Sequence, residues 1–186
     1  MKLRAFSITF LVLFLLLSGC SGSRKFKKNE GFVPRQWSKI AVLPFSGSPH
    51  VRLPAAEWLS FRLLDQQHFN ITPAALATIE LKKKGMTWPQ EDVSVQAAQE
   101  AGQLLEAQGV IVGTAKIWRT SLTVNYQLDI KLIDTRTGEI VCNTVQPTPF
   151  TMTYSDLDRI IACVDRAAKD VLPVLDGLAG KNQHAP

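Results

Sequence analysis

The side chains of this sequence that could do covalent chemistry are few and widely spaced. The cysteines are Cys20, Cys142 and Cys163, and the histidines are His50, His68 and His184. No histidine has a partner at the spacing of a zinc site or a catalytic triad, and there is no Gly-x-Ser-x-Gly elbow and no glycine-rich phosphate loop. The pattern favours a protein without catalysis, metal or cofactor; a hydrolase with dispersed catalytic groups is the alternative.

Cys20 follows a segment that is typical of export signals. Lys2 and Arg4 give a positive start, and residues 6–17 are almost wholly apolar but shorter than the roughly 20 residues that a membrane-spanning helix needs. The run Leu17-Ser18-Gly19-Cys20 resembles the lipobox of bacterial lipoproteins, in which the cysteine thiol accepts a diacylglyceryl group. The resemblance implies a signal peptide over residues 1–19 and a lipid on Cys20. An uncleaved signal anchor is the alternative.

The residues after Cys20 bear on the choice of membrane and on the reach of the folded part. In enterobacterial lipoproteins Asp at the next position retains the protein in the inner membrane, so Ser21 favours the periplasmic face of the outer membrane. Residues 20–38 are polar and basic and predict a tether, which reaches about 60 Å if fully extended. Its cations (Arg24, Lys25, Lys27 and Lys28) either touch anionic headgroups or are simply solvated.

Length and charge limit the classes of protein that fit. A chain of 186 residues suits a single domain, expected over residues 39–178, with a frayed tail over 179–186. Loss of the signal peptide removes Lys2 and Arg4 and lowers the net charge from +5 to +3. This mild excess gives no reason to expect a nucleic-acid partner.

Hydrophobic periodicity predicts the elements that position these residues. Ile40–Phe45 is a short apolar run typical of a strand buried on both faces, and strict alternation over residues 124–132 predicts a half-buried antiparallel strand. Further strands are expected over residues 69–72, 110–118 and 139–145, and helices over residues 55–67, 73–84, 92–108 and 155–173. The order β-α-β-α-α-β-β-β-α predicts an α/β (α+β) fold: a mixed sheet of about five strands with helices packed on it.

Two cysteines remain after Cys20 is assigned to the lipid. Cys142 falls on the last predicted strand, and Cys163 falls on the flank of the apolar stripe of the last helix. A disulfide between them would join helix to sheet and contribute about 3 kcal/mol in an oxidising compartment. Two buried free thiols are the alternative.

Two tryptophans are candidates for an interface. Trp88 stands beside Pro89 in a predicted loop, and Trp118 stands at a predicted strand end. Either could contact a protein partner or a carbohydrate, or pack in the core or its rim. Trp58, on a predicted helix, is expected in the core.

The segment Lys39–Val145 resembles the domain shared by the curli secretion lipoprotein CsgG, the penicillin-binding-protein activator LpoB and the Pel export lipoprotein PelC. The resemblance rests on three pieces: residues 39–45, the passage from Ala97 to Gly113, and Leu128–Val141 with its turn Asp134-Thr135-Arg136-Thr137-Gly138. It implies a domain similar to the N-terminal domain of TolB, no catalysis, and ring assembly in some members.

Length narrows the expectation within this group. A channel of the curli type adds membrane-spanning hairpins of about 20 residues, since each spanning strand needs roughly 9–11, and no spare pair of such strands is found. The tether is short for an activator that reaches an inner-membrane enzyme. We therefore expect a lipid-anchored accessory protein of an envelope export or assembly system, nearest in build to PelC, with a homo-oligomer or an envelope protein as partner; activation of a peptidoglycan synthase is the alternative.

Overall fold

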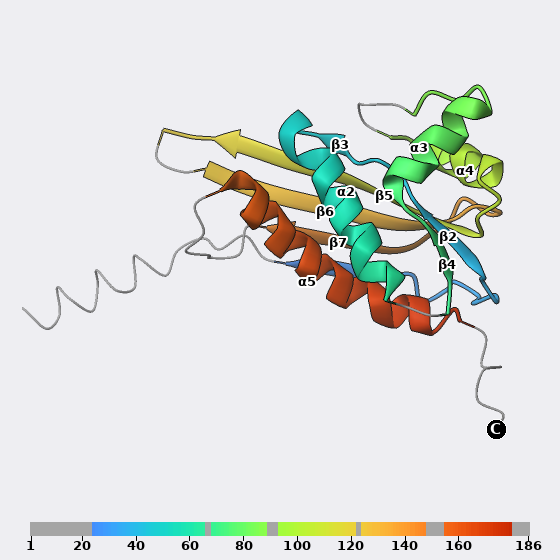
Figure 1. Cartoon of the computed structure of the whole chain (residues 1–186). Helices are drawn as coiled ribbons and strands as arrows, with labels where there is room; N and C mark the ends of the chain where they lie inside the picture. Colours follow the sequence, from blue (N-terminus) through green and yellow to red (C-terminus); the bar gives the residue numbers. More distant parts are fainter. Residues whose placement is uncertain (1–23, 66–67, 89–92, 122–123, 148–154, 180–186) are drawn as a thin grey trace, which may run out of the picture.

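The structure, a computed structural model, describes residues 24–65, 68–88, 93–121, 124–147 and 155–179. Within these ranges it contains one mixed sheet with helices packed on it, so the predicted α+β class is confirmed (Figure 1). The strands are β1 (Lys25–Lys28), β2 (Lys39–Val42), β3 (Ser46–Gly47), β4 (Asn70–Thr72), β5 (Gly109–Arg119), β6 (Val124–Asp134) and β7 (Ile140–Pro147). The helices are α2 (Pro49–Leu64), α3 (Ala74–Lys83), α4 (Val95–Leu104) and α5 (Asp156–Asp176).

The sheet has an antiparallel half and a parallel half that join at β5. Its strand order is β1-β7-β6-β5-β2-β4, and β3 pairs with β5 beyond the end of β2. β5, β6, β7 and β1 pair antiparallel, whereas β2 is parallel to both β5 and β4. The predicted order of elements is kept, and the seven strands exceed the expected five by β1 and β3.

Burial on the central strands follows the predicted periodicity. Ile40 and Val42 pack on the side of α2 and α5, and Ala41 and Leu43 pack on the side of α3 and α4. All four are fully buried, which confirms the expectation of a strand covered on both faces. Along β6 the buried side chains from Tyr126 to Leu132 alternate with half-buried polar ones.

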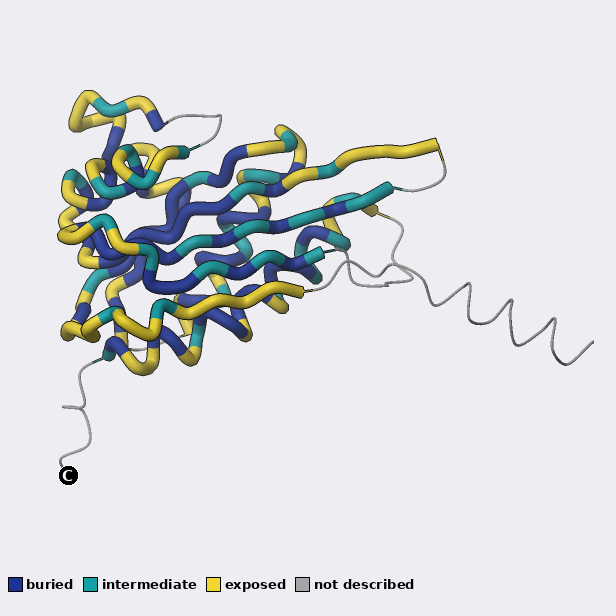
Figure 2. Tube along the Cα trace, turned by 180° about the vertical axis from the view of Figure 1, so that it is seen from behind, coloured by how far each residue is buried: buried dark blue, intermediate teal, exposed yellow. Residues whose placement is uncertain are grey.

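The helices cover the two faces of the sheet unequally. α2 and α5 lie side by side over one face, linked by the Trp58 indole, whose Nε1–H donates to Asp165 Oδ1 at 3.0 Å (Figure 1). On the other face α3 and α4 cover β2 and the first part of β5. The remaining strands of that face lie in the open when the molecule is seen from behind (Figure 2).

The structure corrects the predicted tether over residues 20–38. Lys25–Lys28 form β1, which pairs antiparallel with β7, and Trp37 is buried against Gly109. Alternating apolar residues are absent from β1, whose four side chains are all exposed, so hydrophobic periodicity gives no signal for it. The backbone ladder and the burial of Trp37 therefore join part of this range to the folded unit.

Two helix limits also differ from the prediction because prolines are tolerated inside helices here. α2 begins at Pro49, so Pro54 lies inside it and not at its first turn. α5 runs through Pro173 to Asp176, because Val174, Leu175 and Leu178 continue its buried stripe and offset the lost backbone hydrogen bond. In contrast, α3 stops as predicted: Gly85 has a left-handed φ of 81°, and the Met86 N–H donates to the Leu81 carbonyl at 2.9 Å.

Candidate functional site

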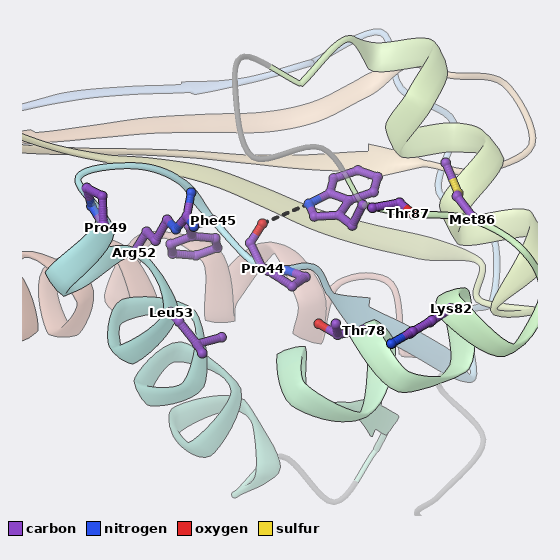
Figure 3. Close-up of a pocket in the computed structure, with 10 residues that line it drawn as sticks. Pro44, Phe45, Pro49, Arg52, Leu53, Thr78, Lys82, Met86 and Thr87 are labelled. Carbon is purple, nitrogen blue, oxygen red and sulfur yellow. Dashed lines mark hydrogen bonds between the residues drawn. The ribbon is translucent and has the colours of Figure 1, made fainter.

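Trp88 lies against the body of the protein rather than on a loop surface. Its side chain is 7% exposed, and its Nε1–H donates to the Pro44 carbonyl oxygen at 2.9 Å (Figure 3). This bond ties the segment after α3 to the link between β2 and β3. Trp88 was predicted either to contact a partner or to pack in the core or its rim. In the structure it packs at the rim, where it forms part of the wall of an opening.

We call this opening the Trp88 cleft. It has a volume of about 590 Å³ and lies between the first turns of α2, the outer side of α3 and the β2–β3 link (Figure 3). Its wall is mostly apolar, with two cations and two threonine hydroxyls; the lining residues are Pro44, Phe45, Pro49, Arg52, Leu53, Thr78, Lys82, Met86, Thr87 and Trp88.

The composition of the wall determines what the Trp88 cleft can do. None of its lining residues is a cysteine, a histidine or a carboxylate, so the hydroxyls of Thr78 and Thr87 have no acid-base partner of these types among the described lining residues. Apolar walls with a few convergent polar groups are typical of binding sites. Arg52 and Lys82 favour a negatively charged occupant. The cleft is therefore suited to binding.

Exposed apolar side chains continue from the cleft along α2 and α3. The two helices meet where the Ala75 N–H donates to Glu57 Oε1 at 2.5 Å. The side chains on them that are about half exposed form what we call the α2–α3 apolar surface: Leu53, Phe61, Leu64, Leu76 and Ile79. These are five of the nine exposed large apolar side chains among the described residues, so apolar exposure is concentrated on one side of the molecule.

Trp118 lies apart from Trp88. It is 45% exposed near the end of β5, opposite Asn125 of β6, whereas β2 pairs with β5 only between Gly109 and Ile111. The two tryptophans predicted for an interface therefore do not form one site. Trp58 is half-buried between α2 and α5, where its ring centroid lies 5.6 Å from that of Phe61.

Cys142 and Cys163 are buried free thiols in the structure, which is the alternative to a disulfide between them. Cys163 Sγ lies 3.6 Å from the Pro147 carbonyl oxygen, five residues further along β7 than Cys142. At about 3.3 Å per strand residue this separates the two cysteines by roughly 16 Å, while a disulfide needs Cα atoms within about 7 Å. Burial raises the pKa of each thiol to about 11, which keeps both protonated and unreactive.

A buried carboxylate on α5, Asp170, is not among the residues predicted from the sequence. Asp170 is 5% exposed, and its Oδ2 accepts from Thr144 Oγ1 and Gln146 Nε2 of β7, each at 2.6 Å. It also forms an ion pair with Arg24, the residue before β1. A signal for it existed: Cys163, Ala167, Asp170 and Val174 are spaced as one helix face, so Asp170 interrupts an apolar stripe.

The remaining candidates lie on the surface or outside the described residues. Cys20 and His184 fall outside them, and His50 and His68 are exposed. In the described part of the chain, no three side chains of the metal-binding types gather as ligands. None of the helices described there is long and apolar enough to span a membrane.

Comparison with known proteins identifies similar folds through structure only. No protein-family model and no curated protein matches the sequence. The structure is similar to PelC from Paraburkholderia phytofirmans, solved as a dodecamer, with a TM-score of 0.53 and 14% identity over 82% of this chain and 98% of that one. It is also similar to lipoprotein GNA1162 from Neisseria meningitidis, with a TM-score of 0.51 and 14% identity over 73% of this chain and 99% of that one. The fold that the predicted resemblance implied is therefore confirmed.

Proposed function

We propose that this chain, which has the fold of PelC, is a lipid-anchored, non-enzymatic accessory protein of an envelope export or assembly system. It sits on the periplasmic face of the outer membrane and acts by assembling with copies of itself and with envelope proteins. The lipid is carried by Cys20, the first residue of the mature chain. The observation that carries the proposal is the similarity to a dodecameric protein that extends over 98% of that protein's length.

The α2–α3 apolar surface supports self-assembly. A monomer that leaves Phe61, Leu64, Leu76 and Ile79 about half exposed on adjoining helices keeps apolar surface in contact with water. Contiguous apolar surface of this kind is typical of protein contacts. In a ring this surface meets a different surface of the next copy, because a closed ring uses head-to-tail contacts.

Sedimentation velocity tests self-assembly through this surface. Residues 21–186 contain every described element, and we expect them to sediment as an oligomer. Phe61→Glu with Leu76→Glu places two charges in the contact and should give monomers with an unchanged circular dichroism spectrum. The matched control is Leu157→Glu, which adds a charge at an exposed leucine of α5 and should leave the oligomer intact. A wild-type protein that stays monomeric at high concentration would contradict the proposal.

The competing function, activation of a peptidoglycan synthase, needs a long reach. Because β1 belongs to the sheet, the chain that joins the domain to Cys20 ends at Arg24. Four residue steps span at most about 14 Å, which keeps the domain beside the membrane that holds the lipid. Direct stimulation of a purified synthase by this protein, and not by an unrelated lipoprotein, would favour the competing function.

A further inference from the structure

The open face of the sheet is basic. In an antiparallel pair, residues directly opposite each other point to the same side, so Lys25 and Lys27 of β1 share a face with Val145 and Asn143 of β7. The same face carries Lys131 of β6, because its neighbours Ile130 and Leu132 point to the other side of the sheet, where α5 packs. Lys116 of β5 is exposed there as well.

We call this surface the basic sheet face and define it by Lys25, Lys27, Lys116 and Lys131. The acidic residue among them is Asp129, which is half-buried opposite Thr114 of β5. The described helices of this side, α3 and α4, lie over β2 and the start of β5, which leaves β6, β7 and β1 open on this face (Figure 2). Lys25, Lys27 and Lys116 are exposed, and Lys131 is half-buried. With four lysines and one aspartate, two copies of the face would repel each other, which disfavours a contact between identical faces.

β1 and the residues on either side of it are fixed to the domain at three points. Arg24 is paired with the buried carboxylate of Asp170. Lys25–Lys28 are held in the ladder with β7, and the Asn29 N–H donates to the Val141 carbonyl at 2.9 Å. Whatever the arrangement of the residues before Arg24, four residue steps from Cys20 span at most about 14 Å.

From these observations we propose that the basic sheet face lies on the anionic surface of the lipid bilayer, with Lys25, Lys27, Lys116 and Lys131 against the headgroups. The proposal deepens the function proposed above and uses its lipid on Cys20. The lipid and the fixed start of β1 bring this edge of the sheet to the membrane, and four lysines turn the open face toward negative charge. The face then orients each copy in the assembly.

Amine labelling tests the orientation on the mature lipidated chain. The protein is placed in vesicles of phosphatidylcholine alone or with phosphatidylglycerol, reacted with an acetylating reagent and analysed by mass spectrometry. We expect the four face lysines to react several-fold more slowly in the vesicles with phosphatidylglycerol. Lys28, which pairs with Cys142 on the α5 side of the sheet, and Lys169, which is exposed on α5, serve as internal controls and should react equally in both.

Charge reversal gives a second readout. Lys25→Glu with Lys27→Glu should abolish the protection of Lys116 and Lys131, while Lys28→Glu with Lys169→Glu, on the opposite side of the sheet, should preserve it. Equal labelling of the face lysines in both vesicles would overturn the proposal. Protection in detergent, or only in crude envelopes that contain other proteins, would also overturn it, since a protein would then cover the face.

A chain without lipid separates failure of this inference from failure of the proposed function. Residues 21–186, which lack both Cys20 and the apolar segment 6–17, should still sediment with phosphatidylglycerol vesicles, with binding about five-fold weaker for each face lysine replaced by alanine. No sedimentation would overturn the basic sheet face even if the natural chain carries a lipid. Sedimentation together with a natural chain that lacks lipid would instead overturn the anchor.

Discussion

Replacing Asp170 should lower the free energy of unfolding by an unusually large amount for a side chain of its size. In Asp170→Ala the Thr144 hydroxyl and the Gln146 amide lose a buried charged acceptor, and Arg24 loses its partner. We expect urea unfolding to report a loss of about 3 kcal/mol. Arg24→Ala should cost about 1 kcal/mol or less, because the Arg24 side chain is 54% exposed.

The matched control for this change is Asp176→Ala, which removes an exposed carboxylate from the same helix. Its free energy of unfolding should stay within about 0.5 kcal/mol of wild type. An Asp170→Ala protein as stable as this control would show that the network adds nothing to stability.

Asp129 should make the protein less stable as the pH rises. Burial raises the pKa of this carboxyl, although Lys131 and Lys116 partly oppose the shift. A raised pKa in the folded state favours the protonated form, so the stability it contributes is present below the unfolded pKa of about 3.9 and is lost as the pH passes the folded value. Asp129→Asn should therefore raise the melting temperature at neutral pH, with no difference near pH 3.

Asp134→Asn should instead lower the melting temperature at neutral pH. Asp134 Oδ1 accepts from the N–H groups of Arg136 and Thr137 at 2.9 and 2.8 Å, so this carboxylate stabilises the β6–β7 turn. Thermal unfolding followed by circular dichroism checks both variants. A lower melting temperature for Asp129→Asn at neutral pH would refute the assignment.

The two domain cysteines should be free and shielded. Titration of a chain carrying Cys20→Ser under denaturing, non-reducing conditions should count two thiols, from Cys142 and Cys163. In the folded protein at neutral pH the reaction should be slow, because both thiols are buried and have a pKa of about 11. A count of zero would mean that a disulfide forms and that α5 can shift along β7.

At this scale the sequence predicts residue types better than partners. Asp170 interrupts an apolar stripe, which is a readable sign of a buried polar group, but Thr144 and Arg24 lie 26 and 146 positions away. The distance between Cys142 and Cys163 likewise depends on the slide of a helix along a strand, which periodicity does not contain. Local pattern therefore identifies candidates, and tertiary packing decides what they contact.

Trp37 should be essential to the first elements of the fold. A Cβ added at Gly109 would lie 2.3 Å from a carbon of the Trp37 ring, so the indole covers the start of β5 directly. Phe32 packs edge-on against it with a centroid distance of 6.2 Å. We expect Trp37→Ala to cost about 3–5 kcal/mol in urea unfolding.

Val33→Ala is the control for this segment, because Val33 is 70% exposed and should change stability by less than about 0.5 kcal/mol. If Trp37→Ala were equally mild, the segment before β2 would be a tether as the sequence suggests, and not part of the core.

Elements with strong periodicity were predictable, and those held by backbone pairing were not. β2, β5, β6, β7 and the four helices follow apolar patterns that exist in the sequence itself. β1 has four exposed side chains, and β3 has two residues. Their positions depend on the edge of β7 and on the end of β5, which only the folded sheet provides.

Across the whole molecule, the exposed apolar side chains and the exposed lysines of the sheet lie on different parts of the surface. The Trp88 cleft and the α2–α3 apolar surface lie at one side, and the basic sheet face lies on the open strands. None of these could be read from the sequence, because each combines residues from distant segments. The basic sheet face is proposed for attachment to a membrane, and the α2–α3 apolar surface for contact between copies.

Native mass spectrometry of the full-length protein, expressed in a bacterium and extracted from its envelope in mild detergent, tests both claims at once. We expect a complex of several copies in which each chain begins at Cys20 and carries the added mass of a lipid. Single chains that begin at another residue and carry no lipid would contradict it.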